Sequence, residues 1–277
     1  MSSVGGEAIA TTPPTAAAWA RRVRGWLAKP VVLRLLSVAV VLVGWQLFGT
    51  AYSTSYPSSI FHSAIKTLWS DVVPAFKDTL EGFGVGYSIC IVAGVPIGLL
   101  MARSRLVELV LEPYVSALYA TPRLALIPVL ILWLGVNFQL RMAVVIVSGL
   151  FPIVLNAYLG GREVDPNLLD VGTAFSANSF QILRTVVYPG SLPYIFAGIR
   201  IGLGRAFIGI IVAEIETSAI GIGNLISSDA GSLQMAAMWV AIISLGVVSI
   251  LLSTGLKWAE RWSTMPWLRT RRIRGWL

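Results

Sequence analysis

Residues 236–256 read AAMWVAIISLGVVSILLSTGL, twenty-one consecutive residues without a charged side chain. About 20 apolar residues in a helix cross a hydrocarbon core of about 30 Å, so this stretch predicts a transmembrane helix. Five further apolar stretches precede it along the chain, at about residues 31–49, 80–102, 114–135, 142–160 and 192–213. We therefore expect an all-α integral membrane protein with about six transmembrane helices.

The composition of the whole chain also favours a membrane protein over a soluble one. Its 277 residues are 56% hydrophobic and only 12% charged, whereas ordinary soluble domains carry about 25% charged residues. Disorder of the bulk of the chain is excluded, because disorder requires low hydrophobicity and high charge. The single cysteine, Cys90, excludes a disulfide scaffold, and with the single histidine, His62, it leaves no ligand set for a metal.

The distribution of basic residues predicts the orientation of the chain. Six spans place both termini on one side, and we assign 17 of the 21 Lys and Arg residues to that side, Arg200 and Arg205 among them. The opposite side receives Lys66, Lys77 and Arg141. By the positive-inside rule both termini are cytoplasmic. The same bias accounts for the net charge of +8 without a nucleic-acid partner.

The sequence predicts three regions. Residues 1–30 form a cytoplasmic, partly disordered tail, because their first half is small, polar and proline-bearing. Residues 31–256 form the transmembrane domain. Residues 257–277 form a basic, Trp-rich cytoplasmic tail suited to the anionic inner leaflet of the lipid bilayer. Within the third span we expect a broken or bent helix, because it contains Pro122 and Pro128.

The connection between the fourth and fifth spans, residues 161–191, is unusually long. Loops of this length are usually functional or disordered, and this one carries helix signals. Asp165 can cap a helix that has Pro166 at its first position. Apolar residues then recur at near-helical spacing, at Leu168, Leu169, Val171 and Phe175.

The second half of this connection predicts another short helix. Residues 176–179 break the first helix, and a second begins at Phe180. We expect Pro189 and Gly190 to end it and Pro193 to begin the next span.

An amphipathic helix on the cytoplasmic side needs a partner for its apolar face. A lipid surface is one alternative, but helices that lie on lipid favour a basic polar face. Here the polar residues are Asp165, Asn167 and Asp170, which an anionic leaflet would repel. We therefore expect a groove of a partner protein to receive this helix.

The segment resembles the cytoplasmic coupling loop of permease subunits of bacterial ABC-type importers. The signature of that loop is Glu-Ala-Ala, three residues, Gly, nine residues and Ile-x-Leu-Pro. Within the family, the chain is most similar to the nitrate, taurine and aliphatic-sulfonate branch. The matching loop residues are Val164-Asp165-Pro166, Leu168, Leu169, Asp170, Ala174, Val186 to Gly190 and Leu192-Pro193. Other motifs resembling that branch are ATPRLALIP at 120–128, IVAE at 211–214 and GIGNLI at 221–226.

Two positions depart from the signature. Asp170-Val171-Gly172 replaces Glu-Ala-Ala, and Ser176 replaces the glycine. The aspartate keeps the acid, while Gly172 inside a helix costs about 1 kcal/mol relative to alanine. Ser176 lacks the freedom of glycine at positive φ, so we expect the chain to bend there in another way. Either a dedicated ATPase partner or a partly degenerate docking loop fits these departures.

The resemblance implies a membrane-spanning permease subunit of an ATP-driven importer in the bacterial inner (plasma) membrane. Two permease chains, expected as a homodimer, would form the translocation pathway, and an extracytoplasmic binding protein would deliver a small anion or small organic solute of the sulfonate, taurine or nitrate type. Two ATPase subunits would bind ATP and Mg, and this chain would hold no cofactor or catalytic residue. The sequence contains no GxxxxGK[ST] motif. The coupling residues implied are Asp165, Pro166, Leu168, Leu169, Asp170, Val171, Gly172, Phe175 and Ser176.

Other residues are candidates within the spans. Thr121 and Arg123 could line the pathway, because an arginine there can pair with an anion; alternatively, Arg123 caps the broken helix or pairs with Glu112. Glu214 could form an outer gate, or it could be a solvated acid at a helix end. A further set has the small-residue spacing of packed membrane helices, namely Gly198, Gly202 and Gly204.

The alternative function from the residues alone is a self-contained secondary transporter or channel. Against it, the six spans show no convincing internal repeat, and few acidic groups are placed to relay protons. An intramembrane enzyme is excluded, because the sequence lacks the HExxH and GxSxG motifs and has one histidine and one cysteine.

Overall fold

The computed structural model describes residues 30–48, 55–217 and 220–271, with side chains described as far as Trp262. Every regular element in these ranges is a helix. The chain divides into two compact units, Met1–Ser59 and Ile60–Leu277. Except for Pro30, the tail expected over residues 1–30 lies outside the described residues, and so do the side chains of the expected tail after Trp262.

The first unit contains helix α2, Pro30–Phe48, where the sequence predicts the first span. Its apolar part, Val31–Leu47, is shorter than the helical runs that are long and apolar enough to cross a membrane. This length lies at the lower end of the range that crosses a bilayer.

The remaining helices follow in chain order. They are α3 (Pro57–Thr67), the π-helical turn η1 (Leu68–Val72), α4 (Val73–Arg103), α5 (Arg105–Ala120), the 3₁₀ turn η2 (Arg123–Leu126), α6 (Ile127–Leu134), α7 (Phe138–Arg162), α8 (Pro166–Ala174), α9 (Ser179–Ile182), the π-helical turn η3 (Leu183–Val187), α10 (Tyr188–Thr217), α11 (Ile222–Gly231) and α12 (Met235–Arg271).

In the described part of the chain, four helical runs are long and apolar enough to cross a membrane: Pro57–Arg103, Phe138–Arg162, Ser179–Thr217 and Met235–Trp262. A fifth candidate is the bent pair Arg105–Ala120 and Arg123–Leu134, whose halves meet at 95°. The break predicted in the third span is thus confirmed. The protein is an all-helical membrane protein with four to five candidate spans, and α2 would supply the sixth that the sequence predicts.

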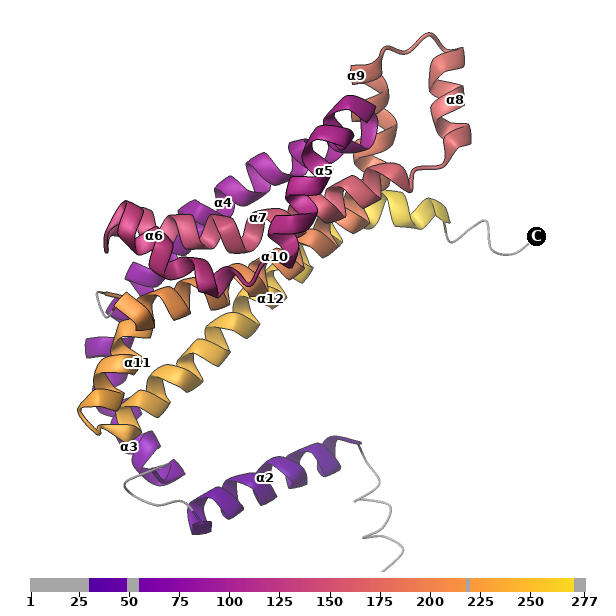
Figure 1. Cartoon of the computed structure of the whole chain (residues 1–277). Coiled ribbons are helices and arrows are strands. Elements are labelled where there is room, and N and C mark those ends of the chain that lie inside the picture. Colours follow the sequence, from indigo (N-terminus) through magenta and orange to yellow (C-terminus); the bar gives the residue numbers. More distant parts are fainter. Residues whose placement is uncertain (1–29, 49–54, 218–219, 272–277) are drawn as a thin grey trace, which may run out of the picture. The chain divides into compact units, whose positions relative to one another are not determined.

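Helix α7 lies between α4 and α10 in the second unit (Figure 1). Glycines bring the three backbones close together. A Cβ on Gly98 of α4 would lie 2.4 Å from the Val154 carbonyl oxygen of α7, and one on Gly202 of α10 would lie 2.9 Å from that of Gly149. Small residues at helix contacts allow the close packing that holds membrane helices together, so these three helices form the core that positions both ends of the molecule.

The helix that follows the long connection is continuous, contrary to our expectation. Pro189 and Gly190 do not end a helix, and Pro193 lies inside α10, so the helical path runs from Ser179 to Thr217. The π-helical turn η3 directly precedes these prolines. Such a turn shifts the backbone pairing locally, which lets the helix continue where a proline lacks an N–H.

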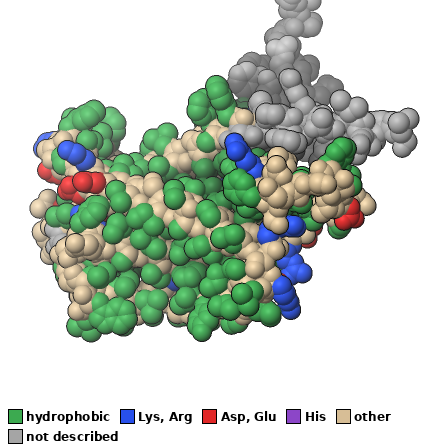
Figure 2. Space-filling model, turned by 90° about the horizontal axis from the view of Figure 1, so that it is seen from above, with side chains coloured by type: hydrophobic (Ala, Val, Ile, Leu, Met, Phe, Trp, Pro, Cys, Tyr) green, Lys and Arg blue, Asp and Glu red, His purple; other side chains and the backbone are tan. Residues whose placement is uncertain are grey.

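The surface is consistent with a lipid environment. Figure 2 shows hydrophobic side chains over most of the visible face, with most charged side chains near two opposite edges. An exposed apolar face of this extent is unusual for a soluble monomer, and in a membrane it would contact lipid or other subunits.

Candidate functional site

Helices α8 and α9 project beyond the long helices at one end of the second unit (Figure 1). Helix α8 begins as its sequence predicts: the carboxylate of Asp165 accepts from the N–H of Asn167 at 2.9 Å, and Pro166 occupies the first turn. This side-chain cap satisfies a backbone donor that the helix cannot pair internally. The predicted helix of the long connection is therefore present.

The C-terminus of α8 corrects our expectation for Ser176. Its φ of 56° lies in the left-handed region, so the serine adopts the conformation that favours glycine. The Ser176 N–H bonds the carbonyl of Thr173, and the Ala177 N–H bonds that of Gly172 at 3.0 Å. This pair of bonds is a Schellman ending. The loop thus keeps the glycine-type turn despite the substitution.

Helix α8 contains no buried residue. Leu168 and Val171 are each 53% exposed, and Phe175 is 84% exposed, while Leu169 is half-buried and Asp170 is exposed.

Gly172 faces the neighbouring α9. A Cβ at this position would lie 3.2 Å from Cγ1 of Ile182. The glycine therefore lets α8 approach α9 closely, which is a packing reason for a residue that otherwise weakens a helix.

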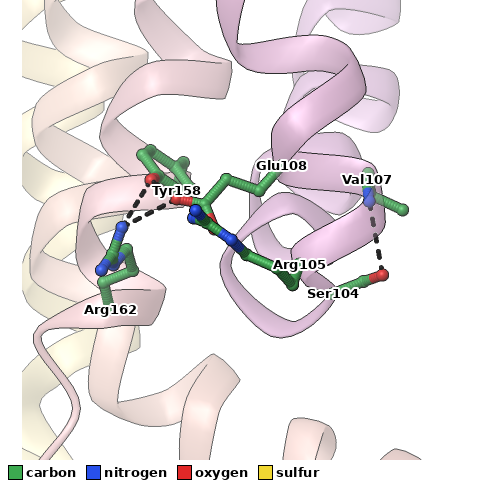
Figure 3. Close-up of polar contacts among 6 residues, drawn as sticks. All are labelled: Ser104, Arg105, Val107, Glu108, Tyr158 and Arg162. Atoms are coloured by element: carbon green, nitrogen blue, oxygen red, sulfur yellow. Dashed lines mark hydrogen bonds and ion pairs between the residues drawn. The ribbon is translucent and has the colours of Figure 1, made fainter.

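A polar network joins α5 to the end of α7, just before α8 (Figure 3). The Glu108 carboxylate accepts from the Tyr158 hydroxyl at 2.6 Å and from Arg162 at 2.8 Å. Arg105 bonds its other oxygen at 3.0 Å, and the Ser104 hydroxyl caps the start of α5. Because Arg162 is the last residue of α7, the network fixes the point from which the α8 segment extends.

A buried carboxylate lies at the opposite end of α7. Glu214 of α10 is 0% exposed. Its Oε2 accepts from the Thr79 hydroxyl of α4 at 2.9 Å and from the N–H of Gly223 at 3.0 Å. Its Oε1 lies 4.0 Å from Nη1 of Arg141. Glu214 is therefore enclosed by protein in this structure, whereas the sequence suggested a gate or a solvated helix end.

This carboxylate holds the start of α11. The Ile222 N–H bonds the Thr79 hydroxyl at 2.9 Å, so Thr79 and Glu214 together bind the first two N–H groups of that helix. Gly221 has a φ of 98°, and a Cβ there would lie 2.3 Å from the Glu214 carboxyl carbon. The glycine at 221 and the glutamate at 214, which the sequence shows as separate motifs, thus belong to one structural unit.

The candidate pathway residues lie at the break between α5 and α6. The Thr121 hydroxyl bonds back to the Ala117 carbonyl at 2.8 Å, and Nη2 of Arg123 bonds the Tyr119 carbonyl at 2.7 Å. Arg123 therefore caps the broken helix, one of the alternatives from the sequence. Glu112 bonds Ser116, and no ion pair between Glu112 and Arg123 occurs in the described chain.

The structure adds two residues to this region that the sequence analysis did not single out as a site. Arg205 of α10 donates to the Tyr119 hydroxyl at 3.1 Å. The guanidinium carbon of Arg205 lies 4.5 Å from the centre of the Tyr119 ring, and that of Arg123 lies 5.5 Å from it. The sequence signal that could have identified Arg205 as a site residue was an arginine inside an apolar span. We instead counted Arg205 with the basic residues of the cytoplasmic side.

The small residues of α10 differ in their surroundings. A Cβ on Gly198 would lie 2.7 Å from Cβ of Asn156, and Gly202 lies against the α7 backbone, whereas Gly204 has no atom within 4 Å of its Cβ position. The first two glycines therefore serve contact with α7 in the same chain, and Gly204 faces open space.

Comparisons with known proteins agree with this architecture. A model of the family described as the binding-protein-dependent transport system inner membrane component matches residues 94–264. A chain of the solved MetNI methionine ABC transporter, in inward-facing conformations, has the same fold with a TM-score of 0.60. It is 19% identical, and the match covers 72% of this chain and 98% of that one.

Curated relatives include transport proteins for three solutes. The chain is 27% identical to the nitrate import permease protein NrtB of Synechocystis, over 83% of this chain and 89% of the relative. It is 26% identical to the bicarbonate transport system permease protein CmpB of Synechococcus elongatus, over 84% and 89%. It is 24% identical to the taurine transport system permease protein TauC of Escherichia coli, over 87% and 91%.

The family model covers more than half of the chain and includes α7, the α8 segment, α10 and the start of α11. Members of the family are multi-pass proteins of the inner membrane, and they work with a separate ATPase and a binding protein. The chain therefore belongs to the binding-protein-dependent transport system inner membrane component family, as a permease subunit, without catalytic activity of its own, of an ABC importer.

Proposed function

We propose that this permease works as a homodimer and is driven by two cytoplasmic ATPase subunits that receive α8 in a groove. Closure of the ATPase pair on ATP and Mg would move α8 and, through it, the two long helices α7 and α10. A binding protein outside would deliver the solute to the pathway. Both termini would face the cytoplasm, on the same side as α8.

The observation that carries this proposal is the uncovered apolar face of α8. Leu168 and Val171 are exposed on a helix that has no buried residue, and Phe175 at its C-cap is exposed as well. Its ends are closed by its own side chains and backbone, so the helix keeps its shape without the partner. An amphipathic helix with such a face is suited to a hydrophobic groove, and the exposed Asp170 would meet a cation of that groove.

The proposed solute is a small anion of the nitrate, sulfonate or taurine type. The basis is the set of relatives named for nitrate, bicarbonate and taurine transport. These solutes share an oxyanion group, which the arginines near the break in the third span suit chemically.

The test is co-purification of the tagged full chain with its ATPase from native membranes in mild detergent. Phe175→Ala removes the exposed aromatic ring at the C-cap of α8. We expect loss of most of the bound ATPase, because truncating an aromatic anchor of an interface typically costs about 2 kcal/mol. Asp170→Ala should give a smaller loss.

The control is Phe61→Ala, which removes another exposed ring (67%) from α3, far along the chain from the loop. It should leave the ATPase bound. Wild-type chain that purifies alone, or equal ATPase recovery with Phe175→Ala and wild type, would refute the docking of α8.

A further inference from the structure

Two arginines meet one tyrosine where the third span breaks. Arg123 comes from η2 and Arg205 from α10, and both guanidinium groups lie against the Tyr119 ring, 5.5 and 4.5 Å from its centre. The Tyr119 hydroxyl accepts from Arg205, which leaves the proton of that hydroxyl available to donate. These three side chains, which we call the arginine–tyrosine cluster, present several donors to one region.

No carboxylate in the described chain forms an ion pair with either arginine of the cluster. Nε of Arg123 and Nη1 of Arg205 are shielded from solvent and have no hydrogen-bond partner. The ion pairs in the described chain involve Arg105, Arg141, Arg162 and Arg200 instead. Both arginine side chains are half-buried, and a cation that is partly withdrawn from water is stabilised by an anionic partner. We therefore expect these two neighbouring guanidinium groups, which have no carboxylate partner, to bind an anion.

The position of the cluster favours a solute over a lipid phosphate. Arg205 lies twelve residues before Thr217, the last residue of α10, a distance of about 18 Å at 1.5 Å per residue. Tyr188, the first residue of α10, lies seventeen residues before Arg205, so a lipid head group level with either end of the helix would not reach the cluster.

The backbone at the cluster is not a regular α-helix. Thr121 and Pro122 separate α5 from the 3₁₀ turn η2, and Pro122 is exposed. In a membrane, non-helical backbone is tolerated only where protein buries it or where it lines a water-filled cavity. A cavity at this break would give a hydrated anion access to the cluster.

We propose that Arg123, Arg205 and Tyr119 form a binding site for a small oxyanion, or for the oxyanion group of a small organic solute, along the translocation pathway. The planar guanidinium forks match the oxygens of a sulfonate, nitrate or carboxylate. The Tyr119 hydroxyl adds a neutral donor and holds Arg205 in place. This inference rests on the importer function proposed above and assigns the chemical class of solute that its pathway accepts.

The test uses the permease purified with its ATPase in lipid nanodiscs. Sodium methanesulfonate and sodium nitrate are titrated at constant ionic strength, balanced with sodium chloride, and the unfolding midpoint is recorded. We expect a saturable rise with methanesulfonate or nitrate, because a ligand of the folded state stabilises it. Arg205→Gln and Arg123→Gln should each weaken the apparent affinity about tenfold or more, and Tyr119→Phe about fivefold.

The control is Arg103→Gln, which removes an exposed arginine at the end of α4 and should keep the wild-type affinity. If an arginine variant fails to fold in chloride, the anion affinity of Tyr119→Phe tests the site instead, because this variant keeps the ring against both guanidinium groups. No saturable response in the wild type, or equal affinity in wild type and variants, would overturn the site.

Three further outcomes distinguish the possible causes. Anion binding that phosphatidylglycerol discs abolish by competition would assign the cluster to a lipid phosphate and overturn the solute site. Normal ATPase co-purification with no anion response would refute this inference alone. Failure of ATPase co-purification would instead refute the proposed docking of α8, on which the importer mechanism rests.

Discussion

Two short helices, α8 before α10 and α11 after it along the chain, are stabilised in opposite ways. Helix α8 is capped by its own Asp165, closed by the turn at Ser176 and contains no buried residue. Helix α11 begins at Ile222, which is 0% exposed, and its first N–H groups bind Glu214 and Thr79. The ends of α8 are stabilised locally, whereas the start of α11 is bound by Glu214 of the preceding helix and by Thr79, 143 residues away in the sequence.

This difference indicates where movement can enter the molecule. A locally stabilised helix can shift as a unit, because few tertiary contacts break when it moves. A helix whose start is bound to α10 and α4 must move with them. In the proposed function, the ATPase therefore acts through α8, while α11 stays fixed to the transmembrane helices.

Among the substitutions that test this comparison, Gly221→Ala should have the largest effect. Its positive φ strains an alanine, and the new Cβ would overlap the buried Glu214 carboxyl group. We expect a loss of about 4 kcal/mol in stability, the sum of backbone strain and overpacking. Thermal unfolding of the purified full chain in detergent would measure it.

Gly204→Ala is the matched control for that substitution. No atom lies within 4 Å of its Cβ position, and alanine is favoured over glycine inside a helix by about 1 kcal/mol. It should unfold at or above the wild-type temperature. Equal unfolding of the two variants would disprove the tight enclosure of Gly221 by Glu214.

Thr79→Val tests the same anchor with a smaller expected effect. The hydroxyl both donates to Glu214 and accepts from the Ile222 N–H, so its removal leaves the buried Ile222 N–H unpaired and takes one of two donors from Oε2 of Glu214. We expect a loss of about 2 kcal/mol, measured by the same unfolding assay. Thr185→Val should lose less than about 0.5 kcal/mol, because its exposed hydroxyl bonds only the Gln181 carbonyl of its own helical run. Wild-type stability in Thr79→Val would contradict the anchoring role.

Ser176→Gly tests the local stabilisation of α8. Glycine relieves the left-handed strain of the serine, worth about 1 kcal/mol, at a turn whose hydrogen bonds already have the glycine-type pattern. Amide hydrogen exchange in Pro166–Ala174 should slow about fivefold, while the global unfolding temperature stays nearly constant. Exchange that becomes faster would mean that the serine stabilises the turn.

Local signals in the sequence predicted much of the loop and part of the spans. The cap at Asp165 and Pro166, the short helix after it and the break at Pro122 follow from interactions within a few residues. Such interactions are the same in any tertiary context, so they could be predicted without a structure. The prediction for Ser176 was wrong, because the energetic cost of a left-handed serine is small enough for the hydrogen bonds of the turn to offset it.

Two other residues show why the rest could not be predicted. Pro189 was expected to end a helix, but the π-helical turn before it lets the helix continue. Arg205 was counted among the basic residues of the cytoplasmic side, and its sequence context did not indicate the contact with Tyr119, 86 positions away. Both outcomes depend on how distant segments pack, which residue patterns do not contain.

The sequence by itself determined that the chain is helical, that it belongs in a membrane and that its long connection forms a capped helix with an apolar face. These properties follow from hydropathy, helix period and capping, all of which act over short distances along the chain. Only the tertiary structure decided that Glu214 closes onto the start of α11 and that Arg123 and Arg205 share one tyrosine ring. Their partners come from other helices, and the close packing of α4, α7 and α10 sets which side chains meet.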